Sequence, residues 1–99
     1  MMIVVAKLKA KKGSENEMEK VLRDVVQKVA AEEGTLAYTL HRSQSDPCTF
    51  MFYEKYTDAG ALKTHSATPY FKAMFAALKD LIESPAEIEM YEELAALNR

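Results

Sequence analysis

The sequence has one cysteine, Cys48, and no tryptophan in 99 residues. A single cysteine excludes an internal disulfide framework and a cysteine-based zinc site, and it fits a reducing cytosol. Glycine and proline occur three times each, and no glycine-rich phosphate loop is present. The longest apolar run, residues 1–6, is too short for a membrane span or a signal-peptide core. We therefore expect a soluble cytoplasmic protein that has no membrane partner.

The sequence also lacks a large excess of either positive or negative charge, because 13 basic and 15 acidic residues give a net charge of −2. Nucleic-acid binders usually carry a basic stripe. Here the lysines between residues 7 and 12 form the one basic cluster, and acidic residues follow it directly. Aromatic RNA-binding motifs are absent as well. No nucleic-acid partner is expected.

Hydrophobic residues make up 48% of the chain, which is ample for one core. A chain of this length buries a bit over ~60% of the surface that its unfolded form exposes, enough for one domain but not for two lobes. We expect a single domain over residues 1–99, with its core at about 2–94 and a short C-terminal tail at 95–99.

Apolar periodicity predicts the elements of this domain. Alternating or β-branched residues predict four strands, at 2–10, 35–43, 49–57 and 86–94. Apolar residues at spacings of three and four predict helices over 14–30, 58–67 and 68–82.

Capping residues mark the helix ends. Ser14 and Glu17 form a capping-box pattern at the start of the first helix, and Gly34 is placed to stop it. Asp58 can cap the second helix, and Thr68-Pro69 starts the third with proline at the first helical position.

The resulting order is β-α-β-β-α-β, an α+β, ferredoxin-like arrangement in which helices cover one face of an antiparallel sheet. The opposite face would carry Ala37, Met51 and Tyr53, with Ile3, Val5 and Tyr91 able to join them. Exposed apolar patches of this kind usually mark an interface. A homodimer with the open sheet faces packed back to back is the simplest closed solution.

Two titratable residues fall on faces predicted to point inward. His65 lies on the buried stripe of the second helix, where it can act as a general base or acid, or else be a hydrogen-bonded core residue. Glu54 lies between Phe52 and Tyr56 on one strand face. A carboxylate there either has a raised pKa and acts as a base, or forms an ion pair with Arg42 across the hairpin. No metal site is recognisable from two histidines and one cysteine.

Six segments stand in a characteristic order along the chain. They are GTLAYTLHRS from Gly34, Asp46-Pro47, FMFYEKY from Phe50, ALKTH from Ala61, ATPYF from Ala67 and the final Met90-Tyr91-Glu92. Together these segments resemble the antibiotic biosynthesis monooxygenase family, and the similarity covers nearly the whole chain. It most resembles the small stand-alone members called quinol monooxygenases. Tyr56 stands where the family usually has tryptophan, and Tyr70 where it often has histidine.

This resemblance implies a dimeric α/β barrel and the oxidation of quinol- or phenol-type aromatics by O₂ as co-substrate, with no cofactor. It implies His65 as base or hydrogen-bond partner, with Glu54 orienting it. Haem binding is not implied, since Leu8 and Phe75 stand where haem-degrading relatives carry their ligands. The substrate pocket would then be formed by Tyr38, Arg42, Phe50, Phe52, Tyr56, Phe71 and Phe75.

Two alternatives stay open at this level. The same pocket could serve an isomerase that acts on a small phosphorylated metabolite. The chain could instead be a non-catalytic dimeric module that binds ligands or takes part in a stress response.

Overall fold

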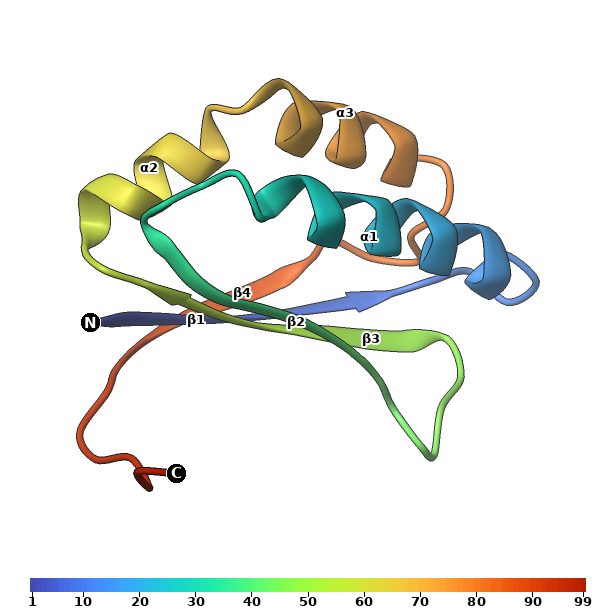
Figure 1. Cartoon of the computed structure of the whole chain (residues 1–99). Helices are drawn as coiled ribbons and strands as arrows, with labels where there is room; N and C mark the ends of the chain where they lie inside the picture. Colours follow the sequence, from blue (N-terminus) through green and yellow to red (C-terminus); the bar gives the residue numbers. More distant parts are fainter.

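The computed structural model describes all 99 residues, and its helices lie on one face of a four-stranded sheet (Figure 1). The sheet is antiparallel throughout, with strand order β2-β3-β1-β4. The ferredoxin-like fold is confirmed. The elements are β1 Met2–Lys9, α1 Glu15–Val29, β2 Thr35–Arg42, β3 Thr49–Tyr56, α2 Ala59–Ser66, α3 Pro69–Leu78 and β4 Glu87–Glu92.

Two of the three predicted N-terminal caps are confirmed, those of α2 and α3. The Asp58 carboxylate accepts from the Ala61 N–H at 2.8 Å, and the Thr68 hydroxyl accepts from the Phe71 N–H at 3.3 Å. The capping box predicted at the first helix is wrong, because the Ser14 side chain makes no capping hydrogen bond. Glu15 accepts instead from the Gly13 N–H at 3.0 Å, where Gly13 has a φ of +96°.

Helix α3 ends four residues earlier than predicted, at Leu78. The backbone that follows α3 is hydrogen-bonded to the end of β1. The Lys11 N–H donates to the Leu81 carbonyl, and the Glu83 N–H donates to the Lys9 carbonyl, both at 2.8 Å. Leu81 lies beyond the end of the helix but still packs in the core.

The core fills the space between the sheet and the helices. Alternate residues of β3, namely Phe50, Phe52, Glu54 and Tyr56, are all buried on this side. Helix α1 contributes Met18, Leu22, Val25 and Val29, and α3 contributes Met74 and Leu78. The hydrophobic periodicity of both helices is therefore explained by one continuous core.

A β-bulge at the start of β2 changes one predicted position. Thr35 pairs with Tyr56 and Ala37 with Lys55, which leaves Leu36 as the extra residue between them. Leu36 is 48% exposed and does not share the buried face with Tyr38, as it would in a regular strand over the predicted range 35–43. Bulges of this kind re-aim side chains near a strand end.

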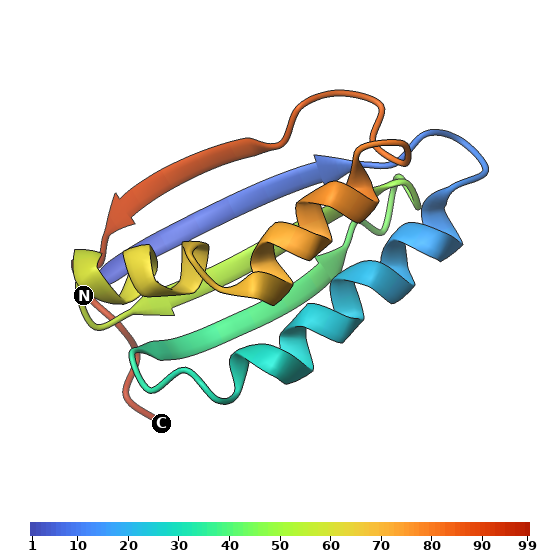
Figure 2. The same cartoon turned by 90° about the horizontal axis from the view of Figure 1, so that it is seen from above.

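Strand β4 lies at the edge of the sheet, beyond the three helices (Figure 2). All six of its residues are exposed. Ile88 and Met90 share the helix side of the sheet, since Met90 pairs with Val4 and Val4 with Glu54. The edge strand therefore presents apolar side chains with no helix above them.

The other sheet face carries the apolar residues expected there. The register places Val5 beside Tyr53, and Ile3 beside Tyr91, on this face. After β4 the chain turns below the sheet (Figure 1), and Glu93 forms an ion pair with Lys55 at 2.9 Å. None of the helices has the length and apolar character needed to cross a membrane.

Candidate functional site

A cavity of about 160 Å³ lies between the sheet, α2 and α3. Most of its lining is apolar and includes Phe52, Phe71, Phe75 and the two β4 side chains Ile88 and Met90. Polar side chains enter this lining from three elements: Tyr38 from β2, Glu54 from β3, and His65 and Ser66 from α2. An apolar pocket with a few convergent polar groups is the usual form of a small-molecule site.

His65 is held at the end of α2 and is 1% exposed. Aromatic rings surround its imidazole, with centroid distances of 5.1 Å to Tyr38, 5.7 Å to Tyr56 and 4.9 Å to Phe71. The Thr68 hydroxyl donates to the His65 carbonyl at 2.8 Å, which fixes the junction between α2 and α3. The imidazole is thus fixed in place by packing and by a capped helix junction.

Glu32 is the partner of His65, and sequence reasoning did not identify it. Its two carboxylate oxygens lie 2.9 and 3.0 Å from His65 Nδ1. The Thr35 hydroxyl donates to it at 2.9 Å, and the Tyr70 hydroxyl donates to it as well. Burial alone would raise the pKa of Glu32, but hydrogen bonds from Tyr70, His65 and Thr35 outweigh burial, and the pKa lies below its usual value.

A signal for Glu32 is present in the sequence, although no periodicity points to it. Glu32 and Glu33 follow the C-terminal end of α1, where the helix dipole disfavours negative charge. An acidic residue at such a place needs another source of stabilisation. In the fold that source is the nearby Thr35 hydroxyl together with Tyr70 and His65, which lie more than 30 residues away in the chain.

The second ring nitrogen of His65, Nε2, is buried and has no hydrogen-bond partner. Leaving such an atom unpaired costs about 1–3 kcal/mol. Nδ1 already faces the Glu32 carboxylate, so Nε2 is the ring nitrogen left without a partner. The cavity-lining histidine therefore offers one unsatisfied ring nitrogen.

Glu54 is 5% exposed, and its Oε1 accepts from the Tyr56 hydroxyl at 2.5 Å. Burial raises its pKa to about 7, against the lowering effect of the Tyr56 hydrogen bond, with a smaller rise from the charge of Glu32. It does not pair with Arg42, so that alternative is wrong. The resemblance implied that Glu54 orients His65, but the carboxylate that contacts His65 Nδ1 is that of Glu32.

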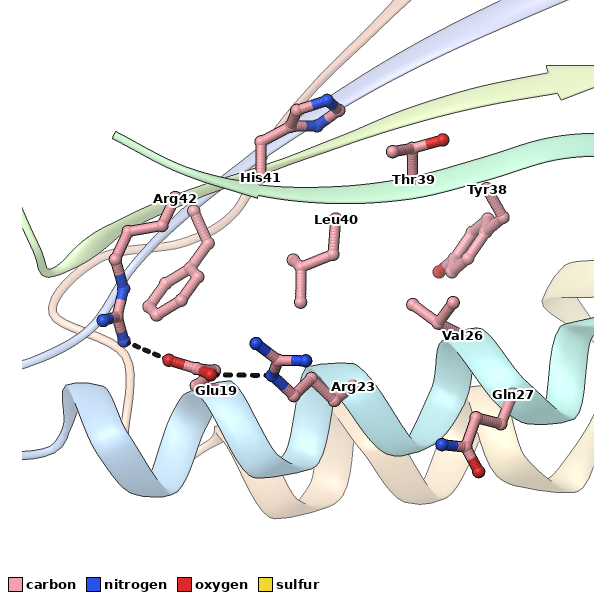
Figure 3. Close-up of a pocket in the computed structure, with 10 residues that line it drawn as sticks. Glu19, Arg23, Val26, Gln27, Tyr38, Thr39, Leu40, His41 and Arg42 are labelled. Atoms are coloured by element: carbon pink, nitrogen blue, oxygen red, sulfur yellow. Dashed lines mark hydrogen bonds and ion pairs between the residues drawn. The ribbon is translucent and has the colours of Figure 1, made fainter. Parts of the chain in front are cut away.

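Arg42 and Phe50 line a different hollow, between α1 and β2 (Figure 3). The Arg42 guanidinium lies 4.9 Å from the centre of the Phe50 ring and donates to Glu19 at 2.6 Å. Glu19 also pairs with Arg23 at 2.7 Å. The two residues are therefore separate from the His65 cavity, and Tyr38 is the side chain that both hollows share.

Of the remaining predicted residues, all but Tyr56 line the cavity. Tyr38 packs on Phe52 at 4.7 Å, and Phe71 packs on Phe75 at 5.0 Å. Tyr56 is fully buried, does not line the cavity and contacts it only through its hydrogen bond to Glu54. Burial is the largest cause that raises the pKa of both Tyr38 and Tyr56. The charge of Glu54 raises the pKa of Tyr38 further, and the hydrogen bond to Glu54 raises the pKa of Tyr56 further. Both hydroxyls therefore stay protonated at neutral pH.

Gly34 does not end α1 in the left-handed conformation, as its predicted helix-stop role would require, because Gly13 is the glycine with positive φ. Glycine is needed at position 34 because the backbone there lies close to α2: a Cβ on Gly34 would meet the Ala61 Cβ at 2.6 Å. This contact joins the loop that carries Glu32 to the helix that carries His65.

Replacing Gly34 by alanine is expected to destabilise the fold by about 1–3 kcal/mol, since the added methyl group must push α2 away from β2. Urea unfolding measures this change. Gly60→Ala in α2 is the comparison, because its Cβ would meet only the capping oxygen of Asp58, at 3.2 Å, and alanine favours the helix, so a smaller loss of stability is expected. Equal stability of the two variants would contradict the close contact.

No group of three or more histidine, cysteine, aspartate or glutamate side chains is placed to hold a metal ion. The His65 dyad has a single carboxylate, and Glu54 is engaged with Tyr56. The groups available for chemistry at this site are His65, its partner Glu32 and a second carboxyl group on Glu54, next to aromatic walls.

Known proteins of similar sequence and structure share this arrangement of elements. The family model of antibiotic biosynthesis monooxygenases matches residues 1–77. A Bacillus subtilis protein named "Putative monooxygenase YcnE" is 31% identical over 89% of this chain and 93% of its own length. An uncharacterised Synechocystis protein is 27% identical over 91% of this chain, which spans only 61% of that relative.

Solved structures agree with these matches. A Caulobacter crescentus structure described as a "putative antibiotic biosynthesis monooxygenase" is 37% identical with a TM-score of 0.89, over 95% of this chain and 90% of its own. A Deinococcus radiodurans structure with the same description is 29% identical with a TM-score of 0.90, over 100% and 98%. With its fold, its cavity and a family match over more than three quarters of its length, the chain belongs to the antibiotic biosynthesis monooxygenase family.

Proposed function

We propose that the protein is a cofactor-independent monooxygenase that oxidises quinol- or phenol-type aromatic molecules with O₂. The observation that carries this proposal is the buried, unpartnered Nε2 of His65 in an aromatic-lined cavity. A phenolic hydroxyl is the matching donor, because it places a proton on an acceptor while its ring remains among apolar side chains.

The size of the cavity supports an aromatic substrate. Its volume of about 160 Å³ is close to that of an engineered apolar cavity of about 150 Å³ that binds benzene. Phe52, Phe71 and Phe75 offer faces and edges for ring packing. Glu54, with one carboxyl oxygen held by Tyr56, provides a second polar group for a second hydroxyl.

The chemistry balances without a cofactor. His65 takes the proton of one hydroxyl, and the resulting anion passes one electron to O₂. The substrate radical and superoxide then join to form a C–O bond, giving a ring peroxide anion, and protonated His65 returns its proton to the outer peroxide oxygen. Loss of the ring hydrogen as a proton breaks the O–O bond, and the hydroxide that leaves takes up this proton to become water. A hydroquinone and O₂ thus become a hydroxyquinone and water, with one oxygen atom in each product.

Oxygen uptake with a panel of hydroquinones tests the proposal. With ¹⁸O₂ we expect one labelled atom in the product ring and one in water. Turnover of a substrate in the absence of O₂ would instead indicate an isomerase, and binding of the panel without any reaction would indicate a ligand-binding module. Either result would refute the monooxygenase.

A pH effect on stability is expected from Glu54. Its pKa of about 7 in the fold is above the ordinary 4.5. The folded chain therefore holds this proton more tightly than the unfolded chain, so the contribution of Glu54 is complete below about pH 4.5 and is lost as the pH rises through about 7. Between pH 5 and 8 the wild type is expected to lose roughly 2–3 kcal/mol relative to Glu54→Gln.

Denaturant unfolding of both proteins at each pH measures the difference, and the glutamine variant removes the titration while keeping the shape of the side chain. Parallel stability curves from pH 5 to 8 would show that the Glu54 carboxyl titrates normally.

We also propose that the functional unit is a homodimer joined through the open sheet face. Val5, Met51 and Tyr53 form the apolar part of this face. Contiguous apolar surface of this kind is rarely left in water. Tyr53→Glu is expected to convert the dimer to a monomer in light-scattering measurements, while Asn16→Glu on exposed α1 leaves it intact. A wild-type monomer at all concentrations would contradict the dimer.

A further inference from the structure

We infer that Glu32 is the positioning residue of the site: its carboxylate holds His65 in the Nδ1–H form, so that Nε2 is the atom that accepts the substrate proton. This inference rests on the proposed function for its catalytic consequence. Its structural content, the proton position on His65, is independent of any substrate.

The first support is the geometry of the pair. Both Glu32 oxygens lie within 3.0 Å of Nδ1, and the two side chains are 9% and 1% exposed. Water therefore cannot compete for Nδ1. Glu54, Tyr38, Tyr56 and Tyr70 are the other titratable groups around the ring, and none of them forms a hydrogen bond with an imidazole nitrogen.

The second support is the set of donors that surrounds Glu32. The hydroxyls of Thr35 at the start of β2 and Tyr70 in α3 both donate to this carboxylate. Two hydroxyl donors favour the anion, because each bond would be lost or weakened on protonation. A charged carboxylate accepts only, so the Nδ1 that faces it is the nitrogen that donates. The lowered pKa of Glu32 agrees with this arrangement.

A carboxylate that stays charged has two effects on its histidine. It orients the ring and selects the tautomer, and it stabilises the imidazolium that forms when Nε2 accepts a proton. Glu32 never touches the substrate, since it lies behind His65 and outside the cavity lining. Its effect on catalysis is therefore exerted through His65.

The direct test is ¹⁵N–¹H correlation NMR of the His65 side chain in the wild-type protein. We expect the neutral ring to show the Nδ1–H pattern, and Glu32→Gln to give mostly Nε2–H or a mixture. A wild-type ring protonated at Nε2 would overturn the inference. So would an unchanged Nδ1–H pattern in Glu32→Gln. Both outcomes are readable even if no hydroquinone is consumed.

Kinetics supply the second readout. Glu32→Gln is expected to lower kcat by roughly 10²–10³-fold with little change in KM, because the substrate contacts remain. Tyr70→Phe is the matched control: it removes one donor but leaves the carboxylate, so we expect the Nδ1–H form to persist and kcat to fall less than about tenfold. If Glu32→Gln does not fold, Tyr70→Phe and the wild-type spectrum still decide the tautomer. A kcat of Glu32→Gln equal to that of Tyr70→Phe would contradict the positioning role.

Discussion

Replacing His65 by asparagine is expected to lower kcat for hydroquinone oxidation by roughly 10²–10⁴-fold while leaving the fold unchanged. The asparagine amide can take the place of Nδ1 and donate to Glu32, which keeps the tie between α2 and the loop after α1. It has no atom at the place of Nε2. The exchange therefore separates the structural contact of His65 from its proposed action as a base.

Oxygen uptake and circular dichroism on the same samples measure the two effects. His41→Asn is the matched control, because His41 lies exposed on β2 outside the His65 cavity and is expected to keep full activity. His65→Gln, which places an amide near Nε2 and leaves Glu32 without this donor, is expected to be both inactive and less stable. An active His65→Asn variant would remove the histidine from the mechanism.

Replacing Leu22 by alanine is expected to have the largest effect on stability. Leu22 is 0% exposed in the middle of α1 and belongs to the core that joins α1, α3 and the sheet. Removal of three carbon atoms from such a site costs about 2–5 kcal/mol, depending on how far the neighbours relax. This is a large part of the roughly 5–15 kcal/mol that holds a domain folded.

Urea unfolding at a fixed protein concentration measures the loss, since dimer formation would make stability depend on concentration. Lys20→Ala on the exposed side of the same helix is the control, and we expect it to stay within about 0.5 kcal/mol of the wild type. A loss below 1 kcal/mol for Leu22→Ala would indicate that the α1 face is loosely packed.

Most of the fold follows from local patterns in the sequence. The alternation in β3 correctly placed Phe52 and Glu54 on the buried face, and the spacing of α1 identified its core stripe. Helix ends were harder to predict. The end of α3 is decided by hydrogen bonds from the end of β1, which lies about 70 residues earlier in the chain.

The candidate site was predictable only in part, because alternation assigns a face and not a position along it. Phe50 and Glu54 share a face of β3 but are four residues, or roughly 13 Å, apart. Phe50 and its neighbour Arg42 therefore belong to the α1 side of the sheet. Glu32 lies in a loop, where no periodicity applies, and only the tertiary fold brings it to His65.

The uncovered edge strand β4 has a consequence for the range of molecules that the cavity accepts. Ile88 and Met90 form its outer rim and are 53% and 60% exposed, while the opposite end is closed by His65 and its rings. If the proposed aromatic substrate binds with its ring against His65, an alkyl chain on that ring leaves the cavity over β4. Under the proposed function, selection then acts on the head of the molecule, and the length of its tail is free to vary.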